Sequence, residues 1–171
     1  TNMSNTYIHC NNLTGGPVCG SHVTNMYRTY INCTNLTGNP VCGNNVIDIG
    51  YAYINCYNLT GHPVCGNNVT NMDYTYFNCT NLTGNPVCGN NVTNMHNTYY
   101  NCTNLSAGDI YFYSPNISNV KNCFGLKNNS RRYNIHVPAN SITLNTCLIN
   151  NADSLVGKAI TWTNSSWTSY Y

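Results

Sequence analysis

Apolar and polar residues follow a fixed pattern that recurs at a constant interval along most of the chain. Four copies follow one another without a gap, over residues 1–23, 24–46, 47–69 and 70–92. A fifth copy begins at Thr93 and departs from the pattern after residue 105, with looser echoes in the segments SNVKNCFGL and VPANSITLNTCLI. Such self-similarity is typical of a repeat solenoid, in which each unit shields the apolar face of the next one.

The spacing of the apolar residues predicts the elements of one unit. In the second copy, apolar positions recur at intervals of four, three and three residues from Met26 to Leu36, which favours one face of a short α or 3-10 helix. Pro40 can neither continue a helix nor donate an amide hydrogen, so the glycine-bounded segment 38–43 predicts a strand of roughly two to four residues. We therefore expect each coil to contain a short helix, a turn, a short strand and a second turn.

Stacking of the units predicts columns of equivalent residues, about 4.8 Å apart where strands pair. The expected columns are Tyr7, Tyr30, Tyr53, Tyr76 and Tyr99; Leu13, Leu36, Leu59, Leu82 and Leu105; and Val18, Val41, Val64 and Val87. Residues 1–105 should thus form a solenoid of about five coils.

The remainder, residues 106–171, should contain degenerate repeats and a β-rich C-terminal cap that covers the open end of the core. Its segments 110–113, 134–137, 141–144 and 159–162 are rich in β-branched and aromatic residues and predict strands.

The segment from Val46 to Cys56, VIDIGYAYINC, resembles the V-x-x-I-G-x-x-A-F-x-x-C pattern of BspA-like, Treponema-type leucine-rich repeats. The resemblance covers about residues 1–105, although Gly-x-Pro stands where that family has an isoleucine-rich strand and Cys replaces its usual Pro. It implies a leucine-rich-repeat solenoid with a short strand and a short helix in each coil. It also implies adhesion at a cell surface, and related Asn- and Cys-rich arrays occur in bacteria and their phages.

Charge excludes some classes of partner. Only 6% of the residues are charged and the formal net charge is +2, which is too little for binding to a nucleic-acid backbone. Arg28 is the single Lys or Arg among the first 105 residues. No apolar run approaches the roughly 18 to 20 residues of a membrane-spanning helix, and no leader is visible, so no membrane insertion is expected. Because the chain opens at Thr1 inside a repeat, we expect a fragment of a larger extracellular, cell-surface or virion-attached protein.

The 11 cysteines form two columns, with Cys123 and Cys147 outside them. The columns are Cys10, Cys33, Cys56, Cys79 and Cys102, and Cys19, Cys42, Cys65 and Cys88. Their separation does not match the close pairs of zinc sites, so no metal is expected. Two alternatives remain: disulfides across a coil, as between Cys10 and Cys19, or reduced thiols that act as small buried hydrophobes, which the spacing favours.

Few residues are suited to catalysis. The chain has four aspartates and no glutamate, and it contains none of the common catalytic or phosphate-binding motifs. Asp48 and Asp73 lie in adjacent coils and could form a glycosidase-like pair, but charge complementation at predicted helix starts explains them as well. The histidines His9, His22, His62, His96 and His136 share no repeat position, which favours substitutions for Asn over a ligand column. We expect neither an enzyme nor a cofactor.

Asparagines in Asn-x-Ser/Thr motifs recur at stacked positions, including Asn35, Asn58, Asn81 and Asn91. Glycosylation is one interpretation, but ladders of side-chain amides between coils fit the recurrence better, since glycans on every coil would crowd one another.

The two residues that follow the T-N-M motif vary between otherwise matching units. The pairs are Ser4–Asn5, Tyr27–Arg28, Gly50–Tyr51, Asp73–Tyr74 and His96–Asn97. From them we predict a binding stripe of Tyr27, Arg28, Tyr51, Asp73, Tyr74 and His96, because aromatic rings beside hydrogen-bonding groups suit carbohydrate or protein surfaces. The alternative is that these solvent positions are simply unconstrained.

The leading functional hypothesis is a non-enzymatic binding or adhesion module that presents one face of a solenoid to a host, a cell-surface glycan or a partner protein. A structural fibre or spacer that self-associates by stacking of repeats is the alternative. A polysaccharide-active enzyme that uses Asp48 and Asp73 is a third hypothesis.

Overall fold

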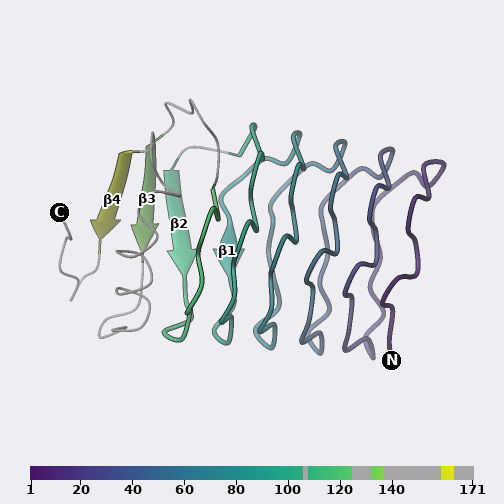
Figure 1. The fold of residues 1–171 in the computed structure, drawn as a ribbon, viewed down its shortest axis with the longest axis horizontal. Coiled ribbons are helices and arrows are strands. Elements are labelled where there is room, and N and C mark those ends of the chain that lie inside the picture. Colours follow the sequence, from purple (N-terminus) through teal and green to yellow (C-terminus); the bar gives the residue numbers. More distant parts are fainter. Residues whose placement is uncertain (106–107, 125–131, 137–158, 164–171) are drawn as a thin grey trace.

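A computed structural model describes residues 1–105, 108–124, 132–136 and 159–163. The coils stand side by side along the long axis, and four strands lie toward the C-terminal end (Figure 1). These strands, β1 (Val87–Cys88), β2 (Gly108–Phe112), β3 (Arg132–His136) and β4 (Ala159–Thr163), form one parallel sheet in the order β1-β2-β3-β4. Within the described ranges there is no helix long and apolar enough to cross a bilayer.

Backbone hydrogen bonds join equivalent positions of adjacent coils. The N–H groups of Met26, Arg28, Tyr30 and Asn32 donate to the carbonyls of Asp48, Gly50, Ala52 and Ile54, at donor-to-acceptor distances of 2.7 to 3.0 Å. The same pattern recurs along the stack, and parallel bridges such as Asn2↔Asn25 and Asn71↔Asn94 pair equivalent positions of successive units. Every coil is thus bonded to the next through its main chain rather than only through side chains.

The predicted helix in each coil is wrong, because the described residues contain no helix. In its place stand consecutive turns, in which the N–H of Thr29 donates to the carbonyl of Met26 at 3.1 Å and that of Cys33 donates to Tyr30 at 3.3 Å. The third residue of each turn, Arg28 or Asn32, has a left-handed φ of 57° or 58°. A left-handed residue interrupts a right-handed helix, yet turns of this length bring an apolar side chain inward every three or four residues, as a helix does.

The core contains the predicted tyrosine column. Rings of Tyr30, Tyr53, Tyr76 and Tyr99 stack at centroid distances of 5.4 to 5.6 Å, with interplanar angles of 3° to 9°. The leucine column from Leu36 to Leu105 is also buried. The valine column is not part of the core: Val18 is 67% and Val64 46% exposed, and Val41 and Val87 are half-buried.

The repeat continues beyond residue 105 in disguised form. Asn119 pairs with Asn94 as a parallel bridge, and the N–H of Met95 donates to the Asn119 carbonyl at 2.7 Å. Phe124 then stacks on Tyr99 at 5.4 Å and extends the tyrosine column by one ring. The segment 118–124 therefore takes the place that 93–99 has in the preceding coil, offset by two inserted residues.

The strand predictions fit the described part of the chain. The predicted segments 110–113, 134–137 and 159–162 overlap β2, β3 and β4, although residue 137 lies outside the described residues, as does the whole of 141–144. The glycine-bounded return segment forms a paired strand in β1, where Val87 is in register with Tyr111. All four units carry a proline in this segment, which lacks the N–H that a continuous ladder would need, and the earlier coils show single bridges such as Val64↔Val87.

All ten described cysteines are free thiols. In the first column, the thiols of Cys33, Cys56, Cys79 and Cys102 each donate to a tyrosine carbonyl of the preceding coil, at sulfur-to-oxygen distances of 2.8 to 3.0 Å. These thiols are thus both apolar filling and hydrogen-bond donors, a role that requires the reduced form.

Burial keeps the core thiols and phenols protonated. It raises the pKa of the Cys42 thiol to about 11 and that of the Tyr30 phenol to about 12. The same cause raises the pKa values of Cys56 and Cys79. At neutral pH all of these groups are uncharged.

The raised pKa values predict a loss of stability at high pH. Above the ordinary thiol value of about 8.5, the unfolded chain releases protons that the folded chain retains. The free energy of unfolding of the reduced protein should therefore be constant from neutral pH to about pH 8.5 and fall as the pH rises toward the values of about 11 and 12 of Cys42 and Tyr30. Urea unfolding followed by circular dichroism at a series of pH values measures this. A free energy that stays constant to about pH 11 would contradict it.

Candidate functional site

The two variable residues of each coil lie on its first turn. The side chain before them fixes this turn: Asn25 Oδ1 accepts the N–H of Tyr27 at 2.7 Å, and Asp48 Oδ1 accepts the N–H of Gly50 at 2.8 Å. Asn71 repeats the contact with Asp73. This local closure, made by a short polar side chain, sets where the variable pair begins on every coil.

The second variable residue is left-handed in every coil, so these positions are not free of constraint. Its φ is 57° at Arg28, 60° at Tyr51 and 51° at Tyr74. Asparagine tolerates this conformation and stands there at Asn5 and Asn97. A bulky residue costs of order 1 to 3 kcal/mol at such a position. Three successive coils therefore carry a residue that the backbone disfavours.

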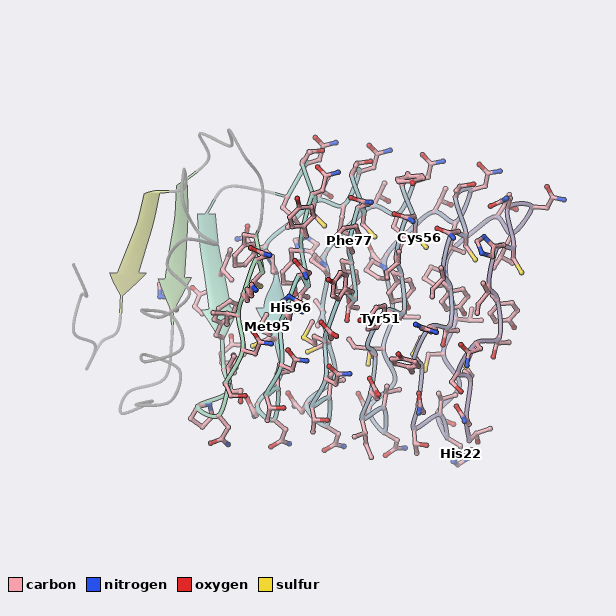
Figure 2. All side chains as sticks on the ribbon, viewed as in Figure 1. His22, Tyr51, Cys56, Phe77, Met95 and His96 are labelled. Atoms are coloured by element: carbon pink, nitrogen blue, oxygen red, sulfur yellow. The ribbon has the colours of Figure 1, made fainter. Side chains whose placement is uncertain are left out.

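Aromatic side chains of the second to fifth coils meet on one side of the stack. We call Tyr27, Tyr51, Tyr74, Phe77, His96 and Tyr100 the aromatic face; all are at least partly exposed. The Tyr51 and Tyr74 rings stack at 5.0 Å, and Tyr27 and His96 contact them edge-on at 5.5 and 5.1 Å respectively. Tyr51, Phe77 and His96 lie on neighbouring coils along this side (Figure 2).

Two residues of the aromatic face were missed by the sequence prediction. Phe77 lies 5.3 Å from the Tyr74 ring, and Tyr100 stacks on Phe77 at 4.9 Å. The signal was present in the eighth position of the unit, which changes from isoleucine in the first three copies to aromatic in the fourth and fifth. Because this position is apolar throughout, its pattern does not distinguish packing from recognition.

Charged and polar groups border the rings. The Arg28 guanidinium carbon lies 5.3 Å from the Tyr27 ring centroid and 5.4 Å from that of Tyr51. At the other end, His96 Nδ1 and Asp73 Oδ1 are 3.1 Å apart. All six residues of the predicted stripe are thus brought together on one face.

The Asp73 carboxylate also acts on Tyr51. Burial raises the pKa of the Tyr51 phenol, and the charge of Asp73 together with their hydrogen bond raises it further. Asn97 Nδ2 lies 2.8 Å from His96 Nε2, so a neutral imidazole with its proton on Nδ1 satisfies both of its neighbours. The polar groups of the face are therefore held in a connected network.

The carboxylate pair of the enzyme hypothesis is not arranged as a matched pair. Asp48 stands in the column that closes the turn, where it accepts hydrogen bonds from Gly50 and from the amide of Asn71. Asp73 stands two positions further along its unit and contacts His96. Asp48 is thus engaged in closing its own coil and joining it to the next.

Asparagine side chains form ladders along the stack. The amides of Asn55, Asn78 and Asn101 donate to the preceding Asn of the same column at 2.6 to 3.0 Å. His9 stands in this column and contacts Asn32, as a substitute for Asn would. The motif asparagines also bridge coils, since Asn81 donates to Asn58 at 3.3 Å.

The described residues of the aromatic face include no metal cluster. Within the part of the chain that the structure describes, no group of three His, Cys, Asp or Glu side chains is arranged to hold a metal ion. An open groove lies elsewhere, lined by His22, Thr24, Asn45, Ile47, Asn68 and Thr70. The rings of the aromatic face follow one another from coil to coil, an arrangement that an extended chain or a surface could contact.

The left-handed position predicts how Tyr51 variants behave. Tyr51→Asn removes the ring contacts but relieves the backbone, so the free energy of unfolding should change by less than about 1 kcal/mol. Tyr51→Val places a β-branched residue at the same φ and should cost about 1 to 2 kcal/mol more than Asn. Urea unfolding under reducing conditions, with equal m-values as the control, measures the difference. Equal stability of the two variants would show that the position is not left-handed in solution.

The comparisons with known proteins add no relative. No protein-family model matches the chain, and neither the curated proteins nor the solved structures contain a match. The functional argument therefore depends on the repeat pattern and on the geometry of the aromatic face.

Proposed function

We propose that this chain is a non-catalytic binding module of the repeat-solenoid type. Its aromatic face would attach a cell-surface or virion-borne protein to a host surface, a glycan or a partner protein. The observation that carries the proposal is the continuous row of partly exposed rings that four successive coils place on one side of the stack.

The cost of these side chains supports a role outside the fold. Asn5, Asn97 and Asn122 occupy the same left-handed position, so the coils can be built with asparagine there. Tyr51 and Tyr74 stand at that position against the preference of the backbone. Strain that the fold does not need is characteristic of residues kept for recognition.

The chemistry of the face also fits recognition. Tyrosine and arginine are enriched among the residues that contribute most to binding, because a rigid ring or planar guanidinium gives much contact area at a low entropic cost. The rings follow the stack axis from coil to coil rather than surround a cavity. An extended ligand that lies along several coils would use them best.

Binding by a matched set of variants tests this function. The triple variant Tyr27→Ser, Tyr51→Asn and Tyr74→Asn replaces each ring by a residue that another coil carries at the same position. Against a panel of glycans and surface proteins, we expect the native chain to bind at least one ligand and the triple variant to lose at least about tenfold in affinity.

The control is Tyr57→Thr, which removes an exposed tyrosine outside the aromatic face and introduces the residue of the neighbouring coils. This variant should bind as the native chain does. A triple variant that is folded by circular dichroism and still binds with native affinity would overturn the proposal, as would the absence of binding to the whole panel.

A structural fibre or spacer is the second candidate function, and a different feature favours it. The return side of the stack carries a row of exposed apolar side chains, including Val18, Val64 and Tyr111. Copies lying side by side would bury this row.

Light scattering tests the structural candidate. If the chain self-associates through the return side, its average mass should rise with concentration and return to the monomer value in Val64→Thr, which keeps the β-branched shape but adds a hydroxyl. The triple variant of the aromatic face serves as the control and should associate as the native chain does. A mass that stays monomeric at all concentrations would eliminate this candidate.

A further inference from the structure

Arg28, which borders the aromatic face, has no anionic partner among the described residues. Arg28 is exposed, and its guanidinium carbon lies 5.3 and 5.4 Å from the ring centroids of Tyr27 and Tyr51. In the same part of the chain, Asp73 contacts His96 rather than Arg28. The guanidinium is therefore held in place by two rings while its charge is not neutralised.

The carboxylates of the third and fourth coils are engaged elsewhere. Asp48 accepts hydrogen bonds from the N–H of Gly50 at 2.8 Å and from the amide of Asn71 at 3.0 Å. Asp73 contacts His96 at 3.1 Å and also the hydroxyl of Tyr51. Both carboxylates thus have hydrogen-bond partners without a contact to Arg28. The Arg28 guanidinium therefore remains able to bind an anionic group of a ligand.

The repeat position of Arg28 is occupied by other residues in the other coils. The backbone there has a φ of 57°, and the equivalent residue is asparagine at Asn5, Asn97 and Asn122. A guanidinium that packs on aromatic rings keeps N–H groups along its edges, in a planar fork that matches a carboxylate or sulfate. Two neighbouring rings restrict its orientation and lower the entropy lost when an anion binds.

We infer that the aromatic face binds an anionic glycan, with a carboxylate or sulfate group on Arg28 and the sugar rings along Tyr51 and Tyr74. The inference rests on the proposed function and names the class of ligand. Tyr27 and Tyr51 are 5.5 Å apart and Tyr51 and Tyr74 are 5.0 Å apart, a spacing comparable with the length of one sugar unit in an extended chain.

The polar end of the face favours a glycan over an acidic peptide. The Asp73 carboxylate can accept more hydrogen bonds than those from His96 and Tyr51, so it offers an acceptor to sugar hydroxyl groups. A polypeptide rich in carboxylates would be repelled by Asp73, whereas a glycan with one acidic group and many hydroxyls meets both ends of the face.

Calorimetric titration with matched probes tests the inference. The probes are an oligosaccharide that carries one uronic acid, the same oligosaccharide with that carboxyl group reduced to an alcohol, an oligosaccharide that carries one sulfate group, and polyglutamate. We expect the native chain to bind at least one of the two anionic oligosaccharides at least about tenfold more tightly than the carboxyl-reduced one. The affinity should fall as salt is raised from about 50 to about 300 mM.

Variants assign this preference to Arg28. Arg28→Asn introduces the residue of other coils and should lower the affinity for the anionic probe to that for the carboxyl-reduced one, without changing the latter. Arg28→Lys keeps the charge but not the planar fork and should retain part of the affinity. Tyr57→Thr, which lies outside the aromatic face, is the control and should bind as the native chain does.

Two results would overturn the inference. First, the native chain and Arg28→Asn could bind the anionic and the carboxyl-reduced probes equally, which would show that charge is not recognised. If the triple variant then lost binding of both probes, the proposed binding function would remain intact. Binding of polyglutamate alone would show that the ligand is not a glycan. If the triple variant still binds every probe, the proposed function itself is contradicted.

Discussion

The backbone hydrogen bonds between successive coils determine the rest of the structure. Each requires a peptide N–H that points along the stack axis, toward a carbonyl of the following coil, as for Met26, or of the preceding coil, as for Ile47. A continuous helix would use the same N–H groups within the coil. Left-handed residues, such as Arg28 and Asn32, occur at two positions per coil and turn the chain. As a result, some N–H groups of a coil point along the stack axis to a neighbouring coil, and others close the turns within the coil. Asparagine suits those positions and can also bridge to the adjacent coil through its amide, which accounts for its recurrence there.

The period, the tyrosine and leucine columns and the place of the variable pairs could be predicted from the sequence, because they depend on register alone. Once copies of the unit are stacked in register, Tyr30 must meet Tyr53, and the exposed pair of one coil must meet that of the next. The clustering of all six predicted residues of the stripe follows from the same register. The free thiols of the first column also agree with the preferred interpretation of their spacing.

The helix could not be distinguished from tandem turns by apolar spacing, since both return a side chain to the core every three or four residues. The recurring asparagine at Asn32, Asn55 and Asn78 was the available signal for turns, because an asparagine in every copy of a helix would be unfavourable. The outward valines were misjudged for a related reason, since hydrophobicity alone does not show which side of a short strand faces the core. Phe77 and Tyr100 were missed because their position is apolar in all five units and changes only from isoleucine to an aromatic residue.

The variable pair has a consequence for how such arrays diversify. Each coil is joined to its neighbours mainly through main-chain groups and columns of equivalent residues, while its two outward residues contact chiefly the outward residues of adjacent coils. A whole unit can therefore be duplicated, deleted or exchanged. Each such change adds, removes or replaces one pair of outward residues and leaves the core columns in register.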